Sequence, residues 1–197
     1  MPHRPNATGI RMRIVGGKHR GRLLVTAEGR LLRPTSDRVK ESIFNILTHG
    51  GGALGARNWI QDAQVLDGFA GTGAMGLEAV SRGATHATLL DNQEAALRCC
   101  RENIEMLHED DHTDVFYADC LKPKTASEPC SLIFLDPPYG LGLTAPALDA
   151  LDSTGWIASN ALAVLEIDKS EEIEVPSKFT VLDERQYGKA KILFLGN

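Results

Sequence analysis

The residues with the clearest chemical meaning form a glycine-rich run that begins with an acidic residue. The run Asp67-Gly68-Phe69-Ala70-Gly71-Thr72-Gly73 continues to Gly76 and contains the spacing G-x-G-x-x-G. It lies between an apolar stretch and a stretch with helical periodicity, which is the context in which such a loop binds a nucleotide. Asp91 lies twenty positions after Gly71, at the end of the next apolar stretch, where a carboxylate can bind ribose hydroxyls.

Two classes of ligand fit this loop: a nicotinamide or flavin dinucleotide, and S-adenosylmethionine. Both contain an adenosine whose hydroxyls suit Asp91, but they differ at the other end. A pyrophosphate is anionic and is repelled by a neighbouring carboxylate, whereas S-adenosylmethionine carries an ammonium and a sulfonium group. Asp67 lies four residues before Gly71 and faces the loop, so it favours S-adenosylmethionine. A tight strand–helix turn that binds no ligand is the remaining alternative.

A third apolar stretch ends at Tyr117-Ala118-Asp119-Cys120. In a parallel sheet the carboxyl ends of neighbouring strands border one crevice. Asp119 can there accept a hydrogen bond from the adenine amino group, although an aspartate in this position is also a common helix cap. The candidate cofactor-binding residues are therefore Asp67, Gly68, Phe69, Ala70, Gly71, Thr72, Gly73, Asp91, Asn92, Asp119 and Cys120.

The element Asp136-Pro137-Pro138-Tyr139 closes the apolar run 132–135 and is the most specific feature of the sequence. Its two prolines fix φ and donate no hydrogen bond, so they hold a rigid turn whose carbonyls point outward. Asp136 and the Pro137 carbonyl supply acceptors for the two N–H groups of an exocyclic base amine. Tyr139 supplies a stacking surface, worth about 1–3 kcal/mol per base. The element indicates methyl transfer to an amine, with Asp136, Pro137, Pro138 and Tyr139 as catalytic residues; a simple Pro-Pro turn is the alternative.

The net charge of -5 conceals an uneven distribution along the chain. Residues 1–40 contain ten Lys or Arg and two acidic residues, a net charge of +8. Residues 41–197 contain 11 basic and 24 acidic residues, a net charge of -13. Such asymmetry predicts that the N-terminal region binds a polyanion. A solvated basic tail is the alternative.

The N-terminal elements can be predicted from glycines and periodicity. Gly16-Gly17 and Gly21 enclose a basic stretch, which predicts a β-hairpin within residues 11–33 whose tip presents Lys18, His19, Arg20 and Arg22. A helix capped by Thr35 or Ser36 follows and ends at Gly50-Gly51-Gly52.

From residue 63 onward, apolar runs alternate with helical stretches, which predicts an α/β fold with a parallel sheet covered on both faces. The expected strands are 65–69, 87–91, 115–118, 132–136 and 162–167. The expected helices are 74–82, 94–107, 145–151 and a short one before residue 132. Residues 179–182 and 192–195 lie on either side of Tyr187-Gly188, which predicts a closing antiparallel hairpin.

Length and composition exclude several classes of protein. The 197 residues suit one domain with at most a small appendage, and 43% hydrophobic and 24% charged residues are ordinary for a globular chain. The four cysteines form no C-x-x-C pair, which predicts free thiols in a reducing compartment. Metal-ligand spacing, a membrane-spanning run and a signal-peptide core are all missing from the sequence. We therefore expect a cytoplasmic protein without metal or membrane partners.

Together these motifs resemble the class I methyltransferases that modify exocyclic amino groups. More narrowly, the chain is similar to the RsmD family, the guanine-N2 methyltransferases of bacterial small-subunit ribosomal RNA. The narrower resemblance rests on the Gly16-Gly17 hairpin and on Arg33-Pro34-Thr35 followed by Asp37-Arg38, and it extends from about residue 11 to residue 195. Further matching segments are Arg13-Ile14-Val15, Gly21-Arg22, Leu32, Val39, Glu41, Phe44-Asn45, Gly76-Leu77-Glu78-Ala79, Ser81-Arg82-Gly83 and Tyr187-Gly188. Asp91 stands where the family commonly has Glu, which shortens its reach to the ribose.

The resemblance implies a Rossmann-like class I methyltransferase fold, with a seven-stranded, mostly parallel sheet whose last strand is antiparallel, preceded by an N-terminal hairpin and helix. It implies S-adenosylmethionine as methyl donor and 16S ribosomal RNA, or a small-subunit particle, as partner of a monomer. We expect residues 1–34 to form a basic extension and residues 35–197 the methyltransferase domain. The hairpin and the following segment are expected to hold RNA phosphates near the crevice, through Arg11, Arg13, Lys18, Arg20, Arg22, Arg33 and Arg38.

Several alternatives stay open at this point. Arg38 has a rival partner in Glu41, three positions later on the same helix. The same chemistry could act on adenine N6 in DNA, although the short chain has no separate target-recognition domain. A non-catalytic RNA-binding assembly factor and a dehydrogenase are the other two hypotheses. The intact Asp136-Pro137-Pro138-Tyr139 element argues against the assembly factor, and binding of nicotinamide would be required for the dehydrogenase.

Overall fold

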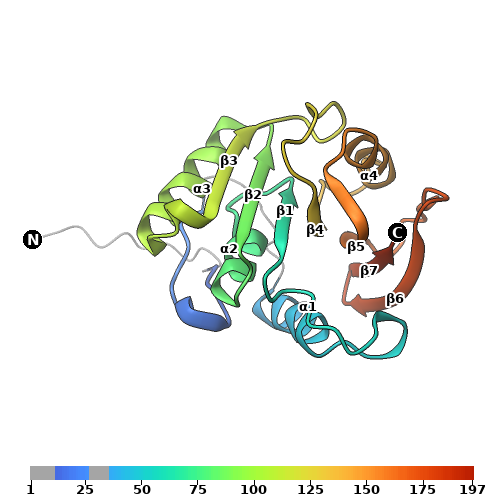
Figure 1. The fold of residues 1–197 in the computed structure, drawn as a ribbon, viewed down its shortest axis with the longest axis horizontal. Helices are drawn as coiled ribbons and strands as arrows, with labels where there is room; N and C mark the ends of the chain where they lie inside the picture. Colours follow the sequence, from blue (N-terminus) through green and yellow to red (C-terminus); the bar gives the residue numbers. More distant parts are fainter. Residues whose placement is uncertain (1–11, 27–35) are drawn as a thin grey trace, which may run out of the picture.

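The computed structural model describes residues 12–26 and 36–197. Arg11 and Arg33 therefore lie outside the described residues, as do Pro34 and Thr35. The described chain forms one sheet flanked by helices, and Figure 1 shows the sheet running from β3 on the left to β6 on the right. The predicted α/β architecture is confirmed.

The sheet has seven strands in the order β3-β2-β1-β4-β5-β7-β6. The first five strands along the chain pair in parallel, and β7 pairs antiparallel with both β5 and β6. The last strand is therefore the antiparallel one, as predicted. The strands are β1 Gln64–Gly68, β2 His86–Asp91, β3 Thr113–Tyr117, β4 Cys130–Leu135, β5 Ile157–Asp168, β6 Thr180–Tyr187 and β7 Ala190–Gly196.

Two apolar layers cover the two faces of the sheet, because successive side chains of a strand point to opposite faces. Helices α1, α2 and α3 pack on one face together with the N-terminal segment. Helix α4 packs on the other face. The α-helices are α1 Asp37–His49, α2 Ala74–Ser81, α3 Glu94–Leu107 and α4 Thr144–Ser153, and the 3-10 turns are η1 Gly17–His19, η2 Gly52–Leu54 and η3 Asp110–His112.

The N-terminal segment folds back on itself as a minimal hairpin. One bridge joins Arg13 to Leu23, two backbone hydrogen bonds join Ile14 to Gly21 and Arg22, and η1 forms the tip. The predicted hairpin is confirmed over the described residues, although it is much shorter than a strand pair. Glycine is required in its tip because a Cβ on Gly17, whose φ is +73°, would lie 1.8 Å from the Ser81 carbonyl oxygen of α2.

Most predicted boundaries agree with the structure, and two differ. Helix α1 begins after Ser36, whose hydroxyl accepts a hydrogen bond from the Val39 N–H at 3.3 Å, and ends at Gly50. The short helix expected before residue 132 was wrong, because residues 118–129 form turns and irregular chain that contain Pro123 and Pro129. Strand β5 begins five residues earlier than expected, at Ile157, because the polar Ser159 and Asn160 interrupt the apolar pattern.

None of the helices formed by residues 12–26 and 36–197 is long and apolar enough to cross a membrane. Within the same ranges, no three His, Cys, Asp or Glu side chains are grouped as a metal site would require. The four cysteines are free and buried.

Candidate functional site

Five acidic residues lie along the edge of the sheet where the parallel strands β1 to β5 have their carboxyl ends, and we call them the carboxylate cluster: Asp67, Asp91, Asp119, Asp136 and Glu166. The strand register explains part of this grouping. Leu135 of β4 pairs with Leu165 of β5, so Asp136 and Glu166 follow at adjacent positions. Both leucines face α4, so the two acids point to the opposite face, which Asp67 shares. The predicted site acids therefore lie along one edge of the sheet, and Glu166 lies there beside Asp136.

Asp67 is buried at the end of β1. Its Oδ2 accepts a hydrogen bond from the Gly76 N–H of α2 at 2.8 Å. Burial raises the pKa of Asp67 to about 7, against the effect of backbone hydrogen bonds from Gly76 and Met75, and the nearby Asp91 carboxylate adds to the rise. Among the residues that the structure describes, no Lys, Arg or His pairs with Asp67. A buried carboxylate left in this state favours a cationic ligand.

The glycine loop is held in shape by Asp91 at the end of β2. Its two carboxylate oxygens accept hydrogen bonds from the Gly71 and Gln93 N–H groups, each at 2.9 Å. Gly73 adopts a left-handed φ of +75°, which favours glycine. A Cβ on Gly76 would lie 2.4 Å from the Leu89 side chain, so glycine allows α2 to pack closely on β2.

The remaining predicted cofactor residues occupy different environments. Asp119 uses one oxygen to accept the Leu121 N–H at 2.9 Å, so it caps its own turn and keeps the other oxygen available. Burial raises the pKa of the Cys120 thiol to about 12, so Cys120 is a packing residue rather than a nucleophile. Asn92 is exposed, and Thr72 is buried within the loop.

The Asp136-Pro137-Pro138-Tyr139 element follows β4 at the same edge. Asp136 is exposed to solvent as a residue, and its carboxyl group faces the rest of the carboxylate cluster. Burial of the carboxyl group raises the pKa of Asp136 well above its ordinary value, and the Glu166 and Asp67 carboxylates act in the same direction. The Tyr139 hydroxyl donates a hydrogen bond to Glu166 Oε1 at 2.6 Å. Pro137 is buried and Pro138 is exposed.

The predicted RNA-binding residues divide into paired and exposed ones. Arg13 forms an ion pair with Asp37 at 2.6 Å, and Lys18 forms one with Glu109 at 2.7 Å. Arg20, Arg22 and Arg38 are exposed. Over residues 12–26 and 36–197 the structure contains no ion pair between Arg38 and Glu41, so that alternative is wrong; both side chains are exposed to solvent.

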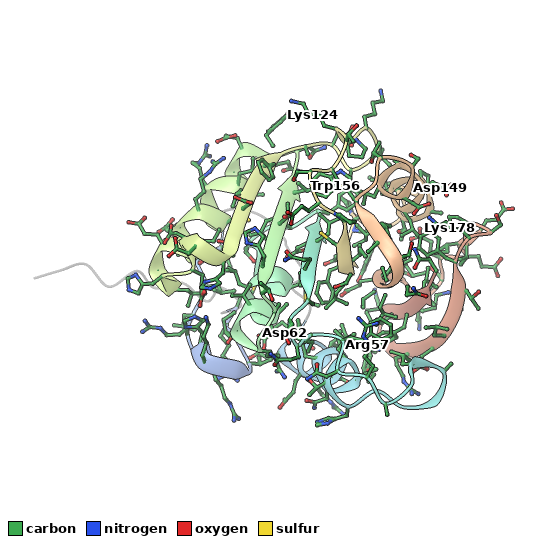
Figure 2. The ribbon with its side chains drawn as sticks, in the orientation of Figure 1. Arg57, Asp62, Lys124, Asp149, Trp156 and Lys178 are labelled. Atoms are coloured by element: carbon green, nitrogen blue, oxygen red, sulfur yellow. The ribbon has the colours of Figure 1, made fainter. Side chains whose placement is uncertain are left out.

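The hairpin tip does not lie beside the carboxylate cluster. Lys18 and Gly17 line a cavity of about 480 Å³ together with Asp62, Thr85 and His112, which come directly before β1, β2 and β3. The cavity is therefore at the amino ends of these strands, and the cluster is at their carboxyl ends. Figure 2 shows the two ends through labelled residues: Asp62 lies at the bottom of the view and Lys124, which follows β3, lies at the top. The expectation that the tip holds phosphates next to the site is corrected accordingly.

Two buried charged residues that sequence reasoning missed anchor the hairpin. Glu78 of α2 accepts the Val15 N–H at 2.7 Å, pairs with Arg82 at 2.7 Å and lies 3.7 Å from the Lys40 ammonium. Lys40 is 1% exposed and also donates to the Arg13 carbonyl. Both residues lie on the buried sides of their helices, where a charge is rare unless it is paired, so these tertiary contacts account for them.

Asn103 of α3 joins the open end of the hairpin to the glycine loop. Its carbonyl accepts the Val25 N–H at 2.7 Å, and its amide donates to the Val25 carbonyl at 3.1 Å and to the Thr72 carbonyl at 3.0 Å. Asn103 has no exposed surface. Val25, at the open end of the hairpin, is thus fixed to the loop expected to bind the cofactor.

The fold and this arrangement of loop and acids define the class of protein: the chain has the class I methyltransferase fold. A family model described as "Conserved hypothetical protein 95" matches residues 12–196. The chain belongs to this family, the RsmD family that the sequence resembled.

Named relatives and a solved structure agree with this membership. "Ribosomal RNA small subunit methyltransferase D" of Haemophilus influenzae is 34% identical over 188 residues, covering 93% of this chain and 92% of that protein. The Escherichia coli K12 protein of the same name is 35% identical over 188 residues, covering 94% and 90%. The solved structure of Escherichia coli yhhF has a TM-score of 0.79 and 33% identity, covering 95% of this chain and 98% of that one.

Proposed function

We propose that this protein transfers a methyl group from S-adenosylmethionine to the exocyclic N2 amine of a guanine in 16S ribosomal RNA. The observation that carries the proposal is the carboxylate cluster along one edge of the sheet, whose members Asp67 and Asp136 have raised pKa values without a compensating cation among residues 12–26 and 36–197. The names of the relatives, which are small-subunit ribosomal RNA methyltransferases, support the class of substrate.

The residues present fit S-adenosylmethionine. Asp67 offers a carboxylate to a cationic group, Asp91 offers its remaining lone pairs to the ribose, and Asp119 offers an oxygen toward the adenine. When bound, this cofactor supplies a methyl group on a positively charged sulfur. The loop Asp67 through Gly73 would hold it. Since no cation lies beside Asp67 in the described chain, the positive charge of the ligand would pair with the Asp67 carboxylate.

The protein's contribution to the reaction is positioning. Asp136 and the Pro137 carbonyl would accept the two N–H groups of the amine, and Tyr139 would stack on the base. A bound S-adenosylmethionine would supply the methyl group, and Asp136 and Pro137 would hold the amine that receives it, with the thioether as leaving group. The nitrogen then loses one proton, which the Asp136 carboxylate accepts and passes to water.

The N-terminal region would hold the RNA. We propose that the basic extension, residues 1–34, precedes a methyltransferase domain of residues 35–197. Arg20, Arg22 and Arg38 are exposed and can bind phosphates, whereas Lys18 and Arg13 already pair with acids. The hairpin tip and the carboxylate cluster lie at opposite ends of the parallel strands, so an RNA that reaches both must extend from one end to the other.

The test is a methyl-transfer assay with the purified protein and labelled S-adenosylmethionine. The substrates are protein-free 16S RNA, small-subunit particles from cells that lack the protein, and duplex DNA. The proposal expects label in RNA or particles, recovered by mass spectrometry as N2-methylguanine. Label in adenine of the DNA, or cofactor binding without any label in RNA, would contradict it.

A further inference from the structure

Glu166 is an acidic residue inside a strand that otherwise contributes apolar side chains to the core. Its neighbours Leu165 and Ile167 are buried on the α4 face, and Val164 is buried on the other face. Glu166 follows Val164 on that second face and is half-buried. A charge here is costly to the fold, so a contact must account for it.

One such contact is with Tyr139. The tyrosine hydroxyl donates to Glu166 Oε1 at 2.6 Å, a length typical of a hydrogen bond to an ionised acceptor. Pro137 and Pro138 already restrict the backbone before Tyr139. The ring is therefore held at both of its ends, by the rigid turn at Cα and by Glu166 at the hydroxyl.

Glu166 also lies next to Asp136. The pairing of Leu135 with Leu165 sets the two acids at neighbouring positions of adjacent parallel strands. Burial raises the pKa of the Asp136 carboxyl, and the negative charges of Glu166 and Asp67 raise it further.

We propose that Glu166 is a positioning residue for methyl transfer, which fixes the Tyr139 ring for base stacking and keeps negative charge beside the Asp136 atom that accepts the proton. The inference rests on the proposed function. Its two parts are separable, because one depends on the hydrogen bond and the other on the charge.

Two variants separate the parts. Glu166→Gln keeps an acceptor for Tyr139 and removes the charge. The pKa of Asp136 should then fall, so the acid limb of the kcat profile moves to lower pH by about one unit. The plateau value of kcat should fall about three- to tenfold, because a less basic carboxylate accepts the proton less readily. Tyr139→Phe keeps the ring and removes the hydrogen bond, so the KM for RNA should rise severalfold while the acid limb stays in place.

The measurements are kcat and KM for RNA between pH 5.5 and 8.5, with thermal unfolding of each protein alongside. Glu172→Gln, an exposed residue just after β5, is the matched control and should resemble the wild type. If Glu166→Gln unfolds, Tyr139→Phe still tests the hydrogen bond, and an unchanged KM overturns that part. A folded Glu166→Gln protein with the wild-type pH profile overturns the charge part. A wild type that labels no RNA overturns the proposed function itself, and this inference with it.

Discussion

Glu109 and Asp67 are both buried carboxylates, and they lie at opposite ends of the parallel strands. Near the amino ends, Glu109 is contacted by Lys18, His19 and His112. Burial raises the pKa of Glu109, but hydrogen bonds from Lys18 and His19 outweigh it, so its pKa lies below the ordinary value. At the carboxyl ends, the neighbours of Asp67 are backbone N–H groups and other acids, and its pKa is raised to about 7.

This difference distinguishes an acid whose charge is paired within the protein from acids that can bind a positively charged ligand. The Glu109 contacts connect the hairpin tip to the segment between α3 and β3, so the charge of Glu109 is already balanced. In the part of the chain that the structure describes, Asp67 and Asp136 have no such balance. A ligand that brings positive charge would supply it. Burial alone is therefore a weak guide to function, and the partners of each buried acid are a stronger one.

The largest effect is expected from Asp136→Ala. Loss of the carboxylate removes the proton acceptor and one acceptor for the amine, so kcat should fall by about 100-fold or more. The affinity for S-adenosylmethionine, measured by calorimetry, should stay within about twofold of wild type. Asp149→Asn, an exposed residue of α4 labelled in Figure 2, is the control and should leave both quantities unchanged. If Asp136→Ala loses cofactor binding as well, Asp136 acts on the structure of the site.

Asp67→Asn should weaken the binding of S-adenosylmethionine by about tenfold or more, because it removes the charge that faces the cation. It should also stabilise the free protein. The folded-state pKa of Asp67 is above its ordinary value, so the folded state binds the proton more tightly, and stability falls as pH rises from about 4 to about 7. Asp67→Asn has no carboxyl group to titrate, so it does not lose this stability as pH rises. Urea denaturation at pH 8 should give a free energy of unfolding about 1–3 kcal/mol higher than wild type, and a lower value would contradict the account.

Glu109→Gln should destabilise the protein, which is the opposite of the effect on stability expected for Asp67→Asn. The substitution removes the charge that pairs with Lys18 and His19, so the free energy of unfolding should fall by about 1–3 kcal/mol. The affinity for S-adenosylmethionine should not change, since Glu109 lies at the other edge. Parallel urea and calorimetry experiments check both statements. A variant of wild-type stability with weakened cofactor binding would remove the distinction between the two edges.

The smallest effects are expected at the exposed arginines. Arg20→Ala and Arg22→Ala should each weaken RNA binding a few-fold and reduce the slope of log affinity against log salt by about one per lost phosphate contact. Cofactor affinity should be unaffected. Lys18→Ala loses the ion pair with Glu109, so it should lower the melting temperature and have little effect on the affinity for RNA. Filter binding at three salt concentrations distinguishes these results, and equal effects of Lys18 and Arg20 on RNA would argue against the division into paired and exposed residues.

The elements that depend on local pattern could be predicted from the sequence. Helix α3, residues 94–107, was predicted with both ends correct, because its apolar residues recur at helical spacing. Asp67, Asp91 and Asp136 could be predicted as one group, since each ends a strand of a parallel sheet. The closing hairpin of β6 and β7 followed from two apolar runs around Tyr187-Gly188.

The residues that could not be predicted act through contacts between distant segments. Lys40, Glu78 and Asn103 are polar helix residues, and the backbone groups that pair with them inside the protein belong to the hairpin segment. Glu166 interrupts an apolar strand, and that interruption was the one available signal. The position of the hairpin tip likewise follows from the fit of Gly16 and Gly17 against α2, which a charge count cannot reveal.

The most direct test of the central claim is the affinity for S-adenosylmethionine at pH 6 and at pH 8, measured by calorimetry for the wild type and for Asp67→Asn. Titration of the ligand's own amino group affects both proteins equally, so the ratio of their pH dependences isolates Asp67. With a pKa of about 7, Asp67 must lose a proton to bind a cation. The wild-type affinity should therefore rise about tenfold more than that of the variant between the two pH values. Equal pH dependences in the two proteins would contradict the claim that the unpaired Asp67 carboxylate binds the cationic part of S-adenosylmethionine.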